Sequence, residues 1–156
     1  MADRSNKITP IINSLKSTFN GDAWHGPSLQ EILKDITAEQ ALRKIGNSHN
    51  IAELVHHIYA WRYYVIKKLD WDKEYEVPDD FNFIKIDTID EAEWEKLKAQ
   101  LIESQNIIVN SLSVWEEKLL RTEVPNRDFT FTKLLHGLIH HDVYHAGQIR
   151  MLAVSF

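Results

Sequence analysis

The chain has 156 residues and a formal net charge of −5, with 44% hydrophobic and 26% charged residues, a balance typical of a soluble globular domain built around one core. It has no cysteine, which excludes disulfides, thiolate metal ligands and a cysteine nucleophile. The acidic balance gives no electrostatic reason to expect nucleic acid, and no run approaches the ~20 apolar residues that span a bilayer. We expect one domain over residues 1–156, without a signal peptide and located in the cytoplasm.

Amphipathic segments alternate with short clusters of Gly, Pro and Asp. The first predicted helix covers roughly residues 6–19. The connection that follows has about 25 residues, and two of its segments, 28–36 and 37–45, predict short helices. The second long helix is predicted from the capping pair Asn50 and Glu53 to about residue 69. The acidic stretch after it contains a proline and is expected to be a solvated loop.

The third long helix is predicted to open with TIDE at Thr88–Glu91, which fits a capping box, and to continue past Trp115 to Leu119. The fourth is predicted to start at residue 128 or 130 and to end near residue 152. Four long amphipathic helices without a convincing strand predict an all-α fold. We expect a four-helix bundle with a long, partly helical connection between its first and second helices.

The histidines of the predicted fourth helix are not equivalent. Successive helical residues are rotated by about 100°. This rotation places His141 and His145 within the apolar stripe, whereas His136 and His140 fall at its edge or in solvent. Two buried imidazoles one turn apart need partners, because an unpaired buried polar group costs about 1–3 kcal/mol.

A divalent metal would satisfy both rings, because histidines four residues apart on a helix converge on one ion. On the predicted second helix, His57 lies at the border of the apolar stripe, and His56 lies roughly opposite. His57 is therefore the candidate third ligand beside His141 and His145. A site with three histidines keeps open positions for water or substrate, as a catalytic metal requires. The competing interpretation is a pair of histidines that is solvated or hydrogen-bonded without a metal.

Several polar residues near these histidines have candidate supporting roles. Gln148 is a candidate to hydrogen-bond a metal-bound water or a group that lies behind the metal ligands, or is simply a polar residue at the end of the bundle. Asp142 is a candidate fourth ligand, although a solvated or orienting carboxylate is favoured. Glu53 is a candidate base or orienting group for the second-helix ligand, although its capping role is favoured. Ser104 and Gln105 interrupt the apolar stripe of the third helix, which indicates either a cavity lining or a slightly off-register core.

The order and spacing of three stretches resemble those of the DinB/YfiT-like superfamily. They are GPSLQEILKDITAEQALRKI at 26–45, ELVHHIYAW at 53–61 and LLHGLIHHDVYHAGQIRML at 134–152. Within the last stretch, residues 141–148 match the family's His-x3-His-x-Gly-Gln ending. The motifs are short, but together they are specific and extend in effect over the whole chain.

This resemblance implies a four-helix bundle with three metal-binding histidines, which fall here on His57, His141 and His145. It implies a divalent metal, zinc or nickel, both of which suit imidazole ligands. It also implies an enzyme that transfers a small-molecule thiol to an electrophilic substrate. The alternatives are a metal-dependent hydrolase and a non-catalytic, stress-related binding or scaffold bundle. Members of the family commonly dimerise, so a homodimer is expected.

Overall fold

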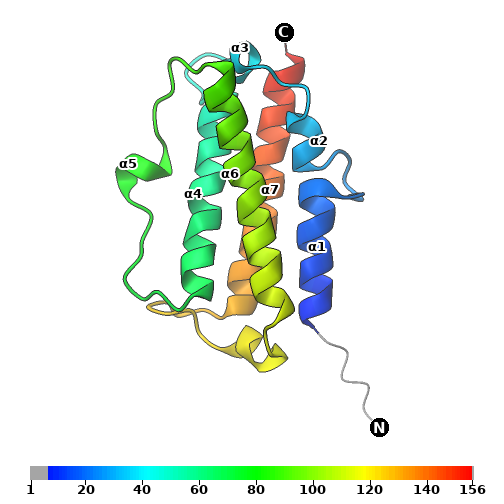
Figure 1. Ribbon diagram of the computed structural model, residues 1–156, viewed down its shortest axis with the longest axis vertical. Coiled ribbons are helices and arrows are strands. Elements are labelled where there is room, and N and C mark those ends of the chain that lie inside the picture. The colour runs from blue at the N-terminus through cyan, green and yellow to red at the C-terminus, as the bar shows by residue number, and fades with distance from the viewer. Residues whose placement is uncertain (1–6, 156) are drawn as a thin grey trace.

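The computed structural model describes residues 7–155, so residue 6, the predicted start of the first helix, lies outside the described part of the chain. Four long helices run along a common axis (Figure 1): α1 (Ile8–Asn20), α4 (Ile51–Leu69), α6 (Glu91–Ser113) and α7 (Phe131–Val154). The described residues form no β-strand. The predicted all-α four-helix bundle is therefore confirmed. No helix in this part of the chain combines the length and the hydrophobicity that a membrane span needs.

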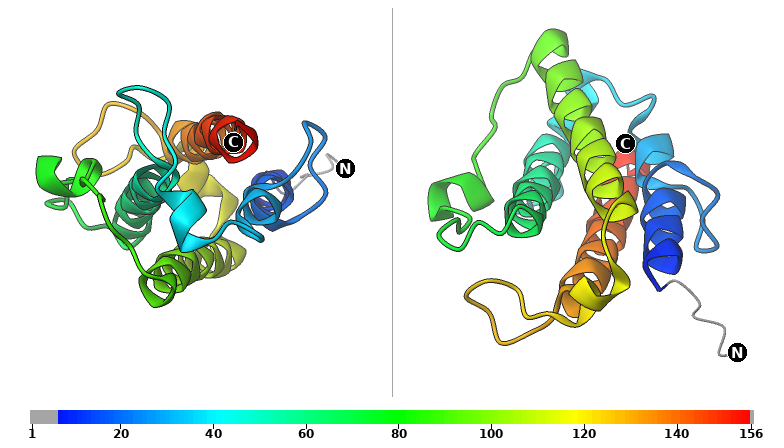
Figure 2. Two further views of the ribbon diagram at one scale, coloured as in Figure 1. Left: turned by 90° about the horizontal axis from the view of Figure 1, so that it is seen from above. Right: turned by 60° about the horizontal axis from the view of Figure 1, so that its bottom comes forward.

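The connection between α1 and α4 is partly helical, as predicted. It contains α2 (Leu29–Leu33) and α3 (Ala38–Ala41), and each opens with a capping box, at Ser28 and at Thr37. α2 packs against α1 and α7, whereas α3 packs against α4 and α6. Seen from above, the segment with α3 crosses over the ends of the long helices (Figure 2). The long connection thus closes one end of the bundle.

The second long helix, α4, begins where the capping pair predicts. Asn50 Oδ1 accepts the Glu53 N–H at 2.8 Å, and Glu53 Oε2 accepts the Asn50 N–H at 3.2 Å. Most residues of α4 are buried, because it packs against α6, α7 and the short helix α5 (Asp79–Asn82). α5 lies in the connection that stands beside α4 (Figure 1). The acidic stretch predicted as a solvated loop therefore covers one side of this helix.

The third long helix, α6, begins two residues later than its predicted capping box. The box is Asp90 with Glu93, whose reciprocal hydrogen bonds measure 2.8 and 3.0 Å, so the predicted box at Thr88–Glu91 is wrong. The Glu91 carboxylate instead accepts the N–H of Ala38 at 2.9 Å, at the first residue of α3. Glu91 is therefore engaged with another helix and does not cap its own.

The end of α6 also differs from the prediction, because Trp115 and Leu119 lie beyond it. Residues Glu117–Arg121 form a 3-10 helix, η1. Trp115 packs edge-on against Phe131, with ring centroids 4.8 Å apart, and stacks on Trp71 at 6.3 Å. Because Trp71 follows α4, Trp115 follows α6 and Phe131 starts α7, this aromatic cluster lies at the end of the bundle opposite α3.

Two apolar clusters fill the bundle, one toward each end. The first cluster includes Ile58 of α4 and Leu101 of α6. The second includes Tyr64 of α4 and Ile108 of α6. Between them lies a belt of buried polar side chains. The belt is at the level of the histidines and positions the site described below.

Arg62 on α4 is the centre of this belt. Its fully buried guanidinium donates to Ser104 Oγ at 2.9 Å, to the carboxylate of Asp142 and to the amide oxygen of Gln105. Gln105 donates in turn to the carbonyl oxygen of Leu15 at 3.0 Å, so all four long helices are joined. A buried charge is tolerated when it is paired and hydrogen-bonded. Ser104 and Gln105 therefore serve this network, and neither lines the two cavities described below.

Candidate metal centre

Three histidine rings meet between α4 and α7. Ring centroids of His57 and His141 lie 5.0 Å apart, those of His57 and His145 4.7 Å, and those of His141 and His145 4.5 Å. One nitrogen of each ring lies within 4.8 Å of those of the other two, and this is the group of metal-ligating side chains found within residues 7–155. The structure therefore brings together the three histidines that helical periodicity singles out.

The other histidines considered as ligands lie elsewhere. His56 is buried on a different side of α4, where its ring packs edge-on against Phe81 with centroids 4.8 Å apart. His136 and His140 are exposed on α7, as predicted. The choice of His57 over its neighbour His56 thus agrees with the position of each ring.

Two of the three rings are held at Nδ1 by an oxygen atom. His57 Nδ1 lies 2.9 Å from the main-chain carbonyl oxygen of Asn82. A carbonyl oxygen only accepts, so Nδ1 carries the proton and donates it. His145 Nδ1 donates to Gln148 Oε1 at 2.6 Å. Gln148 therefore bonds a candidate ligand directly, whereas a bond to a metal-bound water or to a group behind the ligands was expected from the sequence.

The third ring, His141, faces a carboxylate. Its Nδ1 is buried without a hydrogen bond and lies 3.8 Å from Asp142 Oδ1, which is also buried and unpaired. The other oxygen of Asp142 accepts from Arg62. Asp142 is thus a buried carboxylate tied to the core network beside His141, and the orienting role favoured for it over that of a fourth ligand stays a prediction.

In His57 and His145, the nitrogen on the opposite edge of the ring, Nε2, carries the lone pair. A neutral imidazole protonated at Nδ1 accepts at Nε2. The Nε2 atoms of His57 and His141 lie 3.1 Å apart, and two lone pairs at this distance repel each other unless a cation or a proton lies between them. A divalent metal accepts both, and ligating histidines commonly donate their other N–H to an oxygen. The residues present therefore fit a divalent metal.

Burial keeps these rings in the form that binds a metal. Desolvation lowers the pKa of His57 to about 4, the neighbouring histidines lower it further, and the hydrogen bond to Asn82 partly opposes the shift. Desolvation also lowers the pKa of His145, against the opposing hydrogen bond to Gln148. Metal binding requires neutral imidazole. At pH 7, protons therefore compete little with a metal for these two rings.

The three rings open onto a cavity of about 710 Å³. This volume is in the range of small-molecule sites, which are mostly apolar with a few polar groups. Its walls come from α4, from α7, from the segment before α7 and, at Asn82, from α5. The apolar and aromatic wall residues include Trp61, Tyr64, Val65, Phe129, Leu134 and Leu138.

The segment that contains α5 covers another side of the rings. Phe83 stacks on His57 with centroids 3.8 Å apart and planes at 6°, and on its other face stacks on His49 at 4.1 Å. The side-chain oxygen of Asn82 accepts from Trp61 Nε1 at 2.9 Å. Sequence reasoning missed both Asn82 and Phe83 because it interpreted the acidic stretch as solvated. The aromatic residues on either side of Asn82 were the available signal.

Glu53 has a structural role at the start of α4. Its Oε2 accepts from the Asn50 N–H and lies 3.0 Å from His49 Nδ1, while its Oε1 accepts from the Ile86 N–H at 3.0 Å. Both carboxylate oxygens are thus engaged away from His57. The structure gives Glu53 the favoured capping role and not that of a base or an orienting group.

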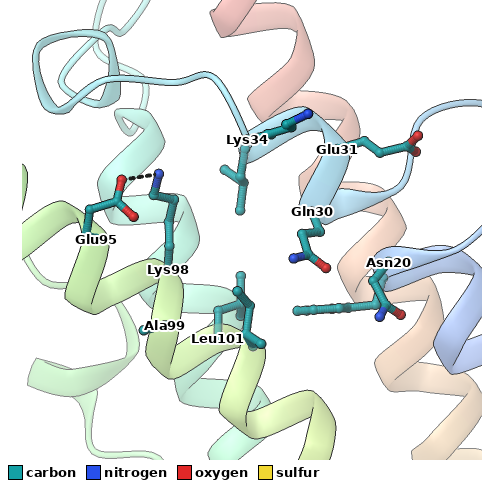
Figure 3. A pocket seen from close by; sticks show the side chains of 11 residues that line it. Asn20, Gln30, Glu31, Lys34, Glu95, Lys98, Ala99 and Leu101 are labelled. Atoms are coloured by element: carbon teal, nitrogen blue, oxygen red, sulfur yellow. Dashed lines mark ion pairs between the residues drawn. The ribbon is translucent and has the colours of Figure 1, made fainter.

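A second cavity, of about 420 Å³, lies between α1, α2 and α6 (Figure 3). Of its four charged side chains, Lys98 pairs with Glu95 at 2.6 Å, and Glu31 takes part in the capping box of α2. No histidine lines it. The chemistry of the protein is therefore expected at the histidine cluster.

Comparison with known proteins agrees with this geometry. The family model described as DinB superfamily matches residues 23–149, a range that contains α4 and all three clustered histidines. Searches among curated proteins and among solved structures gave no match. The helical bundle, the histidine cluster and the matched range together identify the chain as a member of the DinB superfamily.

Proposed function

We propose that this protein is a metal-dependent enzyme that transfers a small-molecule thiol to an electrophilic substrate, with a zinc or nickel ion held by His57, His141 and His145. The observation that carries the proposal is the convergence of the three rings, with Nδ1 atoms held by or facing oxygens. When bound, the ion supplies Lewis acidity, which lowers the pKa of a coordinating thiol or water. A structural zinc normally has four protein ligands, and three favour an open, reactive site.

The residues around the rings support transfer over hydrolysis. Hydrolysis is commonly assisted by a general base that takes a proton from water, but none of the described residues that line the cavity is Asp or Glu. A thiol has a far lower intrinsic pKa than water, so a metal-bound thiol is ionised at pH 7 without such a base. Because the chain has no cysteine, the thiol must arrive with a small molecule. The apolar walls then hold the electrophile and exclude water from it.

A non-catalytic bundle with a structural metal is the alternative, and it needs a fourth protein donor. Asp142 is the carboxylate next to the cluster: one of its oxygens accepts from Arg62, and the other lies 3.8 Å from His141 Nδ1, on the ring edge opposite the Nε2 atom that lies beside His57. The environment of Asp142 therefore supports the catalytic proposal over the structural one.

Metal analysis of protein purified without an affinity tag tests the proposal. We expect about one zinc or nickel ion per chain in the wild type, loss of the ion in His145→Ala, and retention in His56→Ala. His56 is the matched control because it is a buried histidine outside the cluster. Equal loss from both variants would contradict the assigned ligands.

Activity distinguishes the two reactions. A chlorinated aromatic electrophile is incubated with the metal-loaded protein, with and without added low-molecular-weight thiol. We expect product only when the thiol is present, and none from His145→Ala. Turnover without the thiol would support the hydrolase instead.

A further inference from the structure

The cavity beside the histidines has two chemically different ends. Lys133 lines it eight residues before His141 on α7, a separation of about 12 Å at 1.5 Å per residue. Gly137 lines it midway between them. A Cβ atom built on Gly137 would meet nothing within 4 Å. The face of α7 between Lys133 and His141 is therefore open to a ligand of about that length.

Lys133 is the cation of this cavity that is free to pair with a ligand. The other cation, Arg127, is engaged by the carboxylate of Glu76 and donates to a main-chain carbonyl oxygen at 3.0 Å. The Lys133 ammonium lies 5.3 Å from the centre of the Phe129 ring, and no carboxylate within residues 7–155 lies within 4.0 Å of it. Because no wall residue is acidic and Lys133 has no carboxylate partner, the cavity carries net positive charge.

We propose that the substrate is an amphipathic anion. Its ring-containing or alkyl body lies against Trp61, Leu134 and Leu138, and its carboxylate, sulfonate or phosphate group pairs with Lys133. Its other end then lies at the histidines. Lys133 and the histidines lie at opposite ends of the cavity, and this arrangement would fix the direction in which the substrate enters. The reverse orientation would bury a polar group against the apolar walls without a partner, which is costly. This inference rests on the proposed function and adds the chemistry of the substrate.

A pair of fluorescent probes tests the inference on metal-loaded protein. 8-Anilinonaphthalene-1-sulfonate and N-phenyl-1-naphthylamine share an aromatic body, and only the first is an anion. We expect Lys133→Gln to weaken binding of the sulfonate about twofold to fivefold, the range of one exposed ion pair, and to leave the neutral probe unchanged. The control, Lys96→Gln, removes the same charge from an exposed site on α6 and should change neither.

Two further measurements locate the binding. Gly137→Phe fills the middle of the cavity and should weaken both probes, which shows that they bind there. Raising the salt concentration should weaken the sulfonate and not the neutral probe, because ions screen the pair with Lys133. Equal effects of Lys133→Gln and Lys96→Gln on the sulfonate, or insensitivity of both probes to Gly137→Phe, would overturn the inference.

The same probes separate this inference from the proposed function. His145→Ala should lose the metal and still bind the sulfonate with a dependence on Lys133. Wild-type protein that holds a metal but does not distinguish the two probes would overturn the substrate inference and leave the metal site standing. Wild-type protein that holds no metal and binds the sulfonate through Lys133 would overturn the proposed function alone.

Discussion

Lowering the pH should destabilise the metal-free protein through His57, which is buried as a neutral ring. Its pKa is about 4 in the folded chain, against an ordinary value of 6.5, mainly because burial disfavours the charged form. The unfolded chain therefore binds a proton here at pH values where the folded chain does not. The stability that depends on this ring is fully present above pH 6.5 and is lost as the pH falls toward 4.

The size of the effect follows from these two pKa values. At pH 5 the unfolded ring is almost fully protonated and the folded ring about one-tenth protonated, which corresponds to a loss of about 2 kcal/mol in the free energy of unfolding. Water that reaches the ring edge through the cavity reduces this to about 1–2 kcal/mol. Domains are typically stable by only about 5–15 kcal/mol. Burial also lowers the pKa values of His56 and His145, so the wild type should lose more than His57 alone accounts for.

Urea unfolding followed by circular dichroism at pH 7 and pH 5, with a chelator present, measures the effect. The variant His57→Gln keeps an amide that is able to donate to the Asn82 carbonyl oxygen but has no titrating ring. Between the two pH values it should lose about 1–2 kcal/mol less than the wild type. His140→Gln removes an exposed histidine from α7 and should behave like the wild type. A wild-type pH dependence in His57→Gln would refute the reasoning.

Three further changes have defined outcomes. Asp142→Asn should weaken metal binding about tenfold or more in a chelator competition, because it alters the carboxylate that faces His141; unchanged affinity would show that the carboxylate has no orienting role. Gly137→Ala should raise the free energy of unfolding by about 0.5–1 kcal/mol, because alanine favours the helix and its Cβ meets no neighbour; calorimetry would reveal an unexpected loss. Asp90→Ala should cost about 1 kcal/mol in urea unfolding, whereas Thr88→Ala should cost little; the reverse order would restore the box predicted from sequence.

Features that depend on neighbours along the chain were predictable from sequence. The start of α4 follows from Asn50 and Glu53, which satisfy each other within one turn. The grouping of His141 and His145 follows from helical rotation alone. Neighbouring residues did not determine where α6 starts, because Thr88 and Asp90 both fit the pattern of a capping box. It depends on contacts across the fold, among them the hydrogen bond from the Ala38 N–H, 53 positions away, that engages Glu91.

Features that depend on distant partners were not predictable. The polar gap at Ser104 and Gln105 had two local interpretations, and neither included a buried arginine on another helix. Arg62 reaches both of them and also Asp142, 80 positions along the chain. A buried polar residue is understood only with its partner, because the same side chain without one would be destabilising.

The candidate site depends both on neighbours along the chain and on distant partners. The sequence therefore revealed the ligands but only some of the groups that hold them. Helical periodicity identifies the three histidines. Which nitrogen of each ring is free to bind a metal depends on the group that hydrogen-bonds the other nitrogen. For His145 that group is Gln148, which is one turn away and has a recognisable side chain. For His57 it is a main-chain carbonyl oxygen, which every residue type has, so no motif marks it. What places that oxygen is the conformation of the covering segment, held by the bond from Trp61 to the Asn82 side chain and by the Phe83 ring on His57. Metal affinity should therefore respond to changes in this segment even though none of its residues is a proposed ligand.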